Sequence, residues 1–134
     1  MPLKNSKDKS WEGWLVDGLG GQEADFQDAL VRALEGRNIP KSTIKTGTVN
    51  MWWRKDSRYI DVISELDGRI TTTIHIQPYG TSLWIGRAAE QAQAWNYYKR
   101  MAGSSFISTV DRCIKETILG MVESDAMHSV KDVG

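Results

Sequence analysis

The sequence contains one cysteine and two histidines, and it carries no excess charge of either sign. The single thiol, Cys113, excludes an internal disulfide and any zinc site built from several cysteines. The two histidines, His75 and His128, lie far apart with no carboxylate cluster between them, and so match no common spacing of metal ligands. We therefore expect neither a bound metal nor a cofactor.

The balance of charge and the lack of long apolar runs remove further classes of function. Lysine and arginine together number 17, as do aspartate and glutamate. No overall field then steers the chain toward nucleic acid, acidic membranes or acidic substrates. No stretch reaches the roughly 18 apolar residues of a membrane span, and no signal peptide is expected. These features indicate a soluble chain and a cytoplasmic location.

The chain has 134 residues, of which 40% are hydrophobic and 25% charged, as in ordinary globular proteins. Six of the residues are tryptophan. This length fits one domain. We expect a mobile polar leader and an apolar arm at 1–20, a single α+β domain at 21–123, and a frayed tail at 124–134. In the arm, apolar residues recur near helical spacing and predict a side that docks on the domain: Trp11, Trp14, Leu15 and Leu19.

Helical patterns flank the centre of the chain. A helix is predicted at 22–35, where the apolar face includes Phe26 and Leu30 and where Gly36 ends the pattern. A second helix is predicted at 88–102, ended by Gly103. The last helix runs from Ser104 or Ser105 to Glu123 and has the clearest apolar face. Cys113 lies on that face, which predicts a buried structural thiol.

The central segment is typical of antiparallel strands. We expect strands at 43–53, 58–65, 69–77 and 83–87, with a loop at 54–57. The turn at 78–82 uses Gly80 to supply a positive φ. The predicted fold is α+β in two layers, a four-stranded antiparallel meander packed on the N- and C-terminal helices.

The middle hairpin can be placed in register from its faces. A two-residue turn at 67–68 would set an apolar face beside a polar one, whereas a three-residue loop at 66–68 pairs Glu65 with Arg69. That register aligns the apolar faces, because Val62 then lies opposite Thr72 and Ile60 opposite Ile74. On the other face it places Tyr59 beside His75, and Asp61 beside Thr73.

Matching apolar faces extends this pairing to the outer hairpins, with Met51 beside Ile60 and Ile74 beside Ile85. The face away from the helices then carries one line of side chains, which we call the aromatic row: Trp52, Tyr59, His75 and Trp84. Either the chain or a second subunit covers this row, or it is a platform that stacks a planar ligand, a sugar, a base or a partner's side chains. Coverage is favoured, because an exposed row of this size is unusual in a monomer.

The loop beside the row mixes aromatic and basic residues. Arg54, Lys55 and Arg58 follow two tryptophans, which is a pattern found at nucleic-acid and anion contacts. The same residues also suit a solvated loop that keeps a sheet edge soluble. Tyr79 lies in the rim turn and serves either as a turn residue or in recognition.

The candidates for a catalytic role are His75 and Asp61. Asp61 lies one diagonal step from His75 and could orient it, but no convergent acid, base and nucleophile are present, which argues against an enzyme. The favoured function is a small, non-catalytic binding module whose aromatic row holds a protein partner or a second copy in a homodimer. The alternative is a domain that binds a small molecule, a nucleotide or nucleic acid on the same row, and an enzyme using His75 and Asp61 is third.

Overall fold

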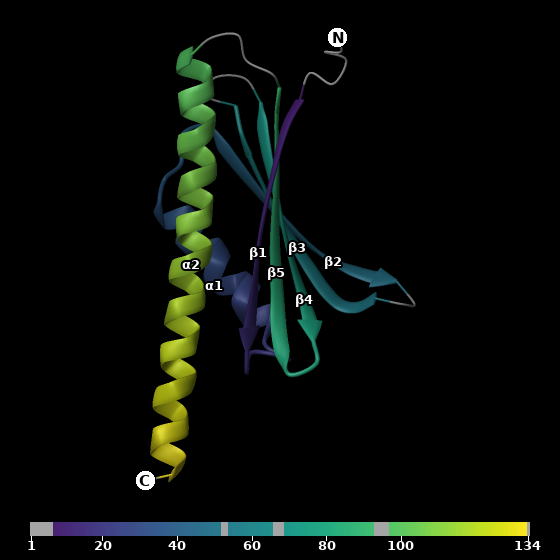
Figure 1. Ribbon diagram of the computed structural model, residues 1–134, viewed down its shortest axis with the longest axis vertical. Coiled ribbons are helices and arrows are strands. Elements are labelled where there is room, and N and C mark those ends of the chain that lie inside the picture. Colours follow the sequence, from purple (N-terminus) through teal and green to yellow (C-terminus); the bar gives the residue numbers. More distant parts are fainter. Residues whose placement is uncertain (1–6, 52–53, 66–68, 93–96, 134) are drawn as a thin grey trace.

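The computed structural model describes residues 7–51, 54–65, 69–92 and 97–133, with side chains at 10–49, 57–65, 69–91 and 101–123. Seven elements follow one another along the chain (Figure 1). They are β1 (Lys7–Asp17), α1 (Glu23–Gly36), β2 (Ser42–Met51), β3 (Arg54–Ser64), β4 (Ile70–Tyr79), β5 (Ser82–Ala92) and α2 (Tyr97–Val133).

The strands form one antiparallel sheet of five strands in the order β1-β5-β4-β3-β2. The α+β class is confirmed, but the prediction of four strands is wrong by one. Residues 7–17, expected as a leader and arm, form an edge strand in which Trp14 lies opposite Ile85. This strand is apolar on both faces, with Trp11 and Leu15 on one and Trp14 and Val16 on the other. The combined pattern imitates helical spacing.

The predicted helix at 88–102 is wrong in its first part, because residues 88–92 complete β5. Alanine and glutamine favour helices, but pairing with β1 on one side and β4 on the other supplies the backbone hydrogen bonds of a central strand. Gly103 does not end a helix, since α2 runs through it to Val133. A Cβ on Gly103 would lie 2.3 Å from Nε2 of Gln91. The missing side chain therefore lets α2 approach β5 closely.

The middle hairpin has the predicted register, with Ile60 opposite Ile74, Val62 opposite Thr72, and Tyr59 opposite His75. The two outer predictions are wrong. Ile85 lies opposite Ile76, a shift of two residues that leaves the faces of β5 unchanged. On β2 it is Thr46 that lies opposite Ile60. This shift is by an odd number of residues and therefore exchanges the faces of β2.

The predicted loop at 54–57 belongs to β3, which therefore begins at Arg54 rather than at Arg58, and the β2–β3 ladder is irregular between Val49 and Met51. The predicted turn before β5 is confirmed, with Gly80 at a φ of 62° between Tyr79 and Ser82. That angle lies in the left-handed region, which glycine adopts without strain.

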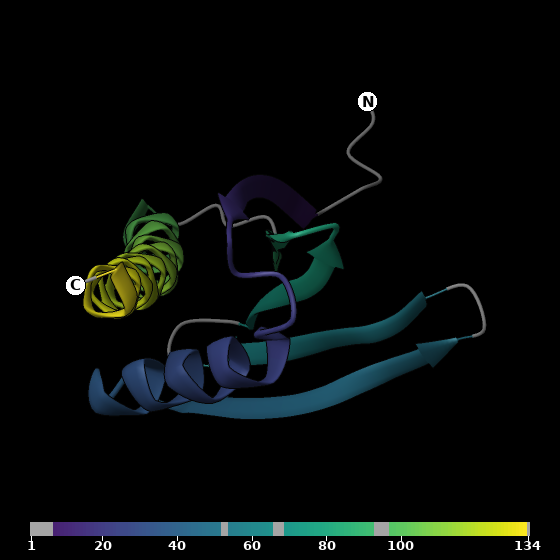
Figure 2. The same ribbon diagram turned by 90° about the horizontal axis from the view of Figure 1, so that it is seen from below.

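Both helices pack on the same face of the sheet (Figures 1 and 2). Alternate residues of the central strands are buried beneath them, and the helices contribute Phe26, Leu30 and Leu34 from α1 and Val110 and Ile114 from α2. Cys113 is fully buried in this core, as predicted. Figure 1 shows the C-terminal part of α2 projecting beyond the end of the sheet. Neither described helix has an apolar stretch long enough to cross a membrane.

The buried, charged side chain of Arg87 connects three elements, β5, α2 and β1. Arg87 lies on the helix-facing side of β5 and is only 4% exposed. Its Nε and Nη2 donate to the two carboxylate oxygens of Asp111 on α2, each at 2.7 Å. Its Nη1 donates to the Ser10 hydroxyl on β1 at 2.8 Å and to the Ser10 carbonyl at 3.2 Å. Such a two-pronged contact is strong and geometrically demanding, so it sets where α2 crosses the sheet.

Replacing Asp111 is expected to destabilise the fold strongly. Asp111→Ala leaves the Arg87 guanidinium buried without its counter-charge, which costs about 3–5 kcal/mol in the free energy of unfolding. Glu116→Ala, which breaks the exposed ion pair of Glu116 on α2 with Arg37, should cost much less, because water screens both charges. Urea unfolding of both variants measures the difference. Equal losses would show that the Arg87 contact does not anchor the helix.

Candidate functional site

The helix-covered side of the sheet contains a cavity of about 240 Å³, which we call the inner cavity. It lies between the first turns of α2, the segment that follows α1, and the adjoining ends of β3 and β4. Its lining residues are Arg37, Ile39, Pro40, Ser64, Ile70, Ala102, Ser105, Phe106 and Thr109. The opposite side of α2, at Gly103 and Asp111, is held against β5. The helix therefore leaves space over β3 and β4.

The inner cavity is apolar with a few polar groups. Its apolar lining residues are Ile39, Pro40, Ile70, Ala102 and Phe106. Two of the hydroxyls are satisfied locally, because Ser64 Oγ donates to the Pro40 carbonyl at 3.5 Å and Thr109 Oγ1 to the Ser105 carbonyl at 2.8 Å. An apolar concavity with few convergent polar groups is the usual form of a small-molecule site.

Arg37 is the charged residue of this lining. It directly follows α1, and its Nη2 donates to Oε1 of Glu116 on α2. The pKa of Arg37 is raised above its ordinary value, mainly because of this hydrogen bond. The side chains of Arg37 and Glu116 are 34% and 55% exposed, so the pair lies at the surface, with Arg37 also lining the cavity.

Close to Arg37 lies the buried thiol of Cys113. Burial raises the pKa of Cys113, and the nearby Arg37 guanidinium only partly opposes the effect. The Sγ atom lies 3.9 Å from the Ala33 carbonyl, which accepts a weak hydrogen bond. A thiol whose pKa is raised holds little of the nucleophilic thiolate at neutral pH, which agrees with a structural role.

The sequence did not reveal the inner cavity. Its residues come from segments separated along the chain, and each of them fits an ordinary core or loop position. The space depends on how far α2 stands from the sheet, and no local pattern encodes that distance.

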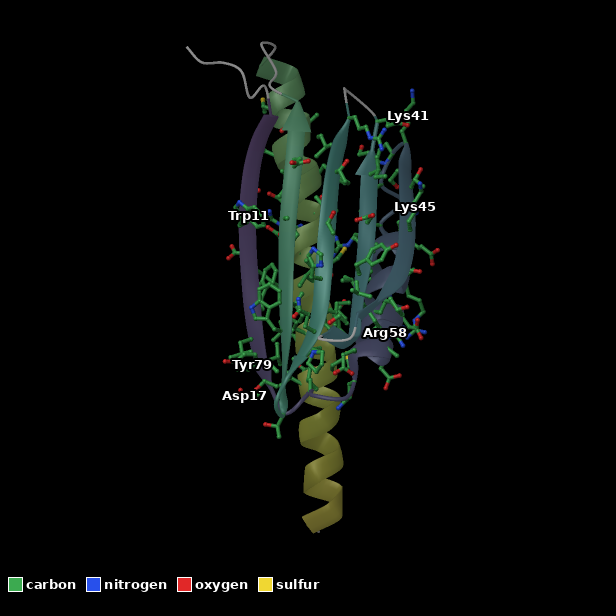
Figure 3. All side chains as sticks on the ribbon, turned by 90° about the vertical axis from the view of Figure 1, so that its right-hand side faces the viewer. Trp11, Asp17, Lys41, Lys45, Arg58 and Tyr79 are labelled. Carbon is green, nitrogen blue, oxygen red and sulfur yellow. The ribbon has the colours of Figure 1, made fainter. Side chains whose placement is uncertain are left out.

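The opposite face of the sheet carries the predicted aromatic row, and Figure 3 looks onto it. Tyr59 and His75 lie opposite each other as predicted. Trp84 is on the same face, but it lies opposite Gln77, and Gly86 takes the place beside His75. Trp52 is outside the described residues. The row is therefore shorter than expected in the described part of the chain.

Of the basic residues predicted beside the row, Arg58 alone has a described side chain, and it lies on the helix-facing side of β3. Arg58 lies opposite Ile76, and its Nη1 donates to Oε1 of Gln27 on α1 at 2.9 Å. Its guanidinium thus serves the contact between α1 and the hairpin. The side chains of Arg54 and Lys55 are outside the described ones. Tyr79 lies at the end of β4 and is 68% exposed (Figure 3).

Glycines allow two aromatic rings to lie flat on the sheet. A Cβ on Gly86 would come 2.2 Å from Cη2 of Trp84, and a Cβ on Gly47 would come 2.5 Å from the Tyr59 ring. Each ring therefore occupies the space that a side chain would fill, an arrangement known to compensate glycine in strands. Trp84 consequently keeps one ring face against the backbone and is 37% exposed.

Beside Trp84 is a groove of about 340 Å³, which we call the open-face groove. It is lined by Trp11, Glu12, Gly13, His75, Trp84, Gly86, Arg87 and Ala88. A second hollow, of about 230 Å³, continues past Trp11 over Thr71, Thr73 and Glu90. Trp11 was not assigned to the row. Its strand spacing with Gly13 and Leu15 was the signal that could have placed it there.

The residues with catalytic potential are adjacent but not assembled into a recognisable set. Asp61 lies opposite Thr73, one step along β3 from the Tyr59–His75 pair. No group of three His, Cys, Asp or Glu side chains that could hold a metal ion occurs among the residues described. Catalysis by His75 and Asp61 stays a prediction.

Comparison with known proteins identifies no family. No family model matches the chain, and no curated protein matches it. A Pseudomonas aeruginosa structure of unknown function is 14% identical, with 75% of this chain and 81% of that one covered and a TM-score of 0.37. A Thermus thermophilus structure is 7% identical, with coverages of 85% and 99% and a TM-score of 0.37. The Zhui aromatase/cyclase from Streptomyces is 9% identical, with coverages of 87% and 94% and a TM-score of 0.34. Likeness this weak transfers neither fold nor function.

The packing of the Trp84 ring against Gly86 can be tested by a double-mutant cycle. Gly86→Ala places a methyl group where the indole lies and should cost about 1–3 kcal/mol in the free energy of unfolding. In a Trp84→Ala background the methyl group has room, so the same change should be neutral or stabilising. Urea unfolding of the four proteins gives the coupling energy.

Gly36→Ala is the control, because a Cβ there would meet no atom within 4 Å. It should cost nothing in either background. An equal penalty for Gly86→Ala with and without Trp84 would contradict the packing of the ring on this glycine.

Proposed function

We propose that this chain is a small-molecule-binding domain that holds a compact apolar ligand in the inner cavity. The observation that carries the proposal is the space of about 240 Å³ left between α2 and the sheet, with a lining that is mostly apolar. Ligand sites between secondary-structure layers commonly have this character, with a few polar groups that fix orientation. Here Arg37 and the Ser105 hydroxyl supply those groups, since the Ser64 and Thr109 hydroxyls donate to backbone carbonyls.

The volume limits the size of the ligand. An engineered apolar cavity of about 150 Å³ is large enough for benzene, so the inner cavity has room for a substituted single ring or a small fused pair. Pockets for drug-sized ligands measure about 300–1,000 Å³, so the inner cavity is smaller than such a ligand needs. The sequence placed its small-molecule alternative on the aromatic row, whereas this cavity lies on the other face of the sheet.

The open face supports a second candidate function, a surface for a protein partner, including a second copy of this chain. Four large apolar side chains are exposed on or at the end of this face: Trp11 at 76%, Leu15 at 56%, Tyr79 at 68% and Trp84 at 37%. Single exposed apolar residues are ordinary, but a contiguous group marks an interaction surface or a ligand groove. This reading keeps the role first expected for the aromatic row.

Filling the inner cavity should abolish ligand binding without unfolding the domain. Ala102→Leu places a larger side chain in the space and should weaken binding of toluene roughly tenfold or more. Toluene is titrated into isotope-labelled protein, and amide chemical shifts are followed. They are expected to move around Ile39, Ile70 and Phe106.

Met101→Leu is the matched control, because Met101 is the neighbouring residue, is 50% exposed and does not line the cavity. It should leave toluene binding unchanged. Shifts confined to the open-face groove, or equal binding by Ala102→Leu, would contradict the proposed site.

Self-association through the open face predicts a concentration-dependent dimer in native mass spectrometry. Trp11→Ser removes the most exposed of these aromatic side chains and should reduce the dimer, because large aromatic residues dominate the energetics of interfaces. Leu119→Ser changes a residue of α2 that is 60% exposed and should have no effect. A monomer at every concentration would exclude a second copy as the partner.

A further inference from the structure

We infer that the ligand of the inner cavity is a small apolar carboxylic acid, whose carboxylate binds Arg37 in place of Glu116. This inference rests on the proposed function and names the class of its ligand. It also assigns Glu116 a part in the site, as a competitor built into the chain that limits the affinity for such acids.

The lining residues carry a positive charge and no negative one. Arg37 is the only charged residue among those that line the cavity, and all the others are apolar or carry a hydroxyl. A guanidinium matches a carboxylate in shape and can form paired hydrogen bonds with it. A cationic ligand would find no counter-charge in this lining, and an uncharged one would gain only the weaker hydrogen bond of a neutral acceptor from Arg37.

The position of Arg37 allows the exchange. Thr109 lines the cavity and Glu116 lies two turns further along α2, on the same side of the helix. Arg37 touches the cavity and forms its ion pair with Glu116, so it lies at the boundary between the two. A change of rotamer turns the guanidinium away from Glu116 and toward the cavity mouth.

The energetics favour the exchange once a carboxylate is in the cavity. The Arg37–Glu116 pair is part-exposed, and such pairs contribute little because water screens both charges. A carboxylate held partly inside the apolar cavity is less screened, so its attraction to Arg37 is stronger. The Ser105 hydroxyl, on the same turn of α2 as Phe106, also lines the cavity and provides a second donor.

This arrangement predicts opposite effects for the two members of the ion pair. Glu116→Gln removes the competing carboxylate and should strengthen the binding of an acid. Arg37→Gln removes its partner and should weaken it. A purely structural ion pair would give changes of the same sign, because either substitution breaks the same contact between α1 and α2.

The test uses phenylacetate and phenylacetamide, which share size and shape but differ in charge. Isothermal titration of the wild-type protein is expected to show a preference for phenylacetate of roughly tenfold. Glu116→Gln should raise that preference by roughly threefold or more, and Arg37→Gln should abolish it while phenylacetamide still binds. Arg32→Gln, on the exposed part of α1, controls for the loss of a positive charge.

The outcomes separate the two proposals. Equal binding of phenylacetate and phenylacetamide, unchanged in Glu116→Gln, overturns the carboxylate inference and leaves the cavity as a site for uncharged ligands. Binding of neither compound to the wild type or to Glu116→Gln contradicts the proposed function, and the inference with it. Should Arg37→Gln unfold, Arg37→Lys keeps the charge without the paired donors and should retain only part of the preference.

Discussion

The contact of Arg87 with Asp111 and Ser10 is the constraint on which the rest of the structure depends. A guanidinium that is 4% exposed requires a counter-charge and a set of acceptors, and these come from the long helix and from the edge strand. Through Arg87, strand β5 thereby fixes both α2 and β1. Because the paired hydrogen bonds tolerate little displacement, the helix has one place to cross the sheet.

That crossing point determines where the molecule has spare volume. Gly103 and Asp111 lie against β5, while Phe106 and Thr109 face the ends of β3 and β4, where the inner cavity is found. The segment that follows α1 closes the same region with Arg37, Ile39 and Pro40, and α1 is itself attached to the sheet. Its Gln27 side chain donates to the backbone carbonyls of Gly47 and Tyr59. The site is thus a product of how two helices are attached.

The sequence predicts the α+β class, α1, the middle hairpin and the burial of Cys113, because each has a strong local pattern. It fails where tertiary pairing overrides propensity, as in the alanine-rich end of β5, and where both faces of a strand are apolar, as in β1. The register of β5 is wrong by two residues because alternation fixes the face but not the partner. Part of the aromatic face could be predicted, whereas the inner cavity could not.

The placement of β1 has a consequence for the newly made chain. The first strand in sequence pairs with the last, and even the contact between the Asp17 carboxylate and the Ser82 hydroxyl joins residues 65 apart. On the ribosome, Trp11 and Leu15 therefore emerge well before the strand that receives them has been synthesised. Contacts of such long range also slow folding. During translation the N-terminal strand is an unpaired apolar edge, the kind of segment on which chaperones act.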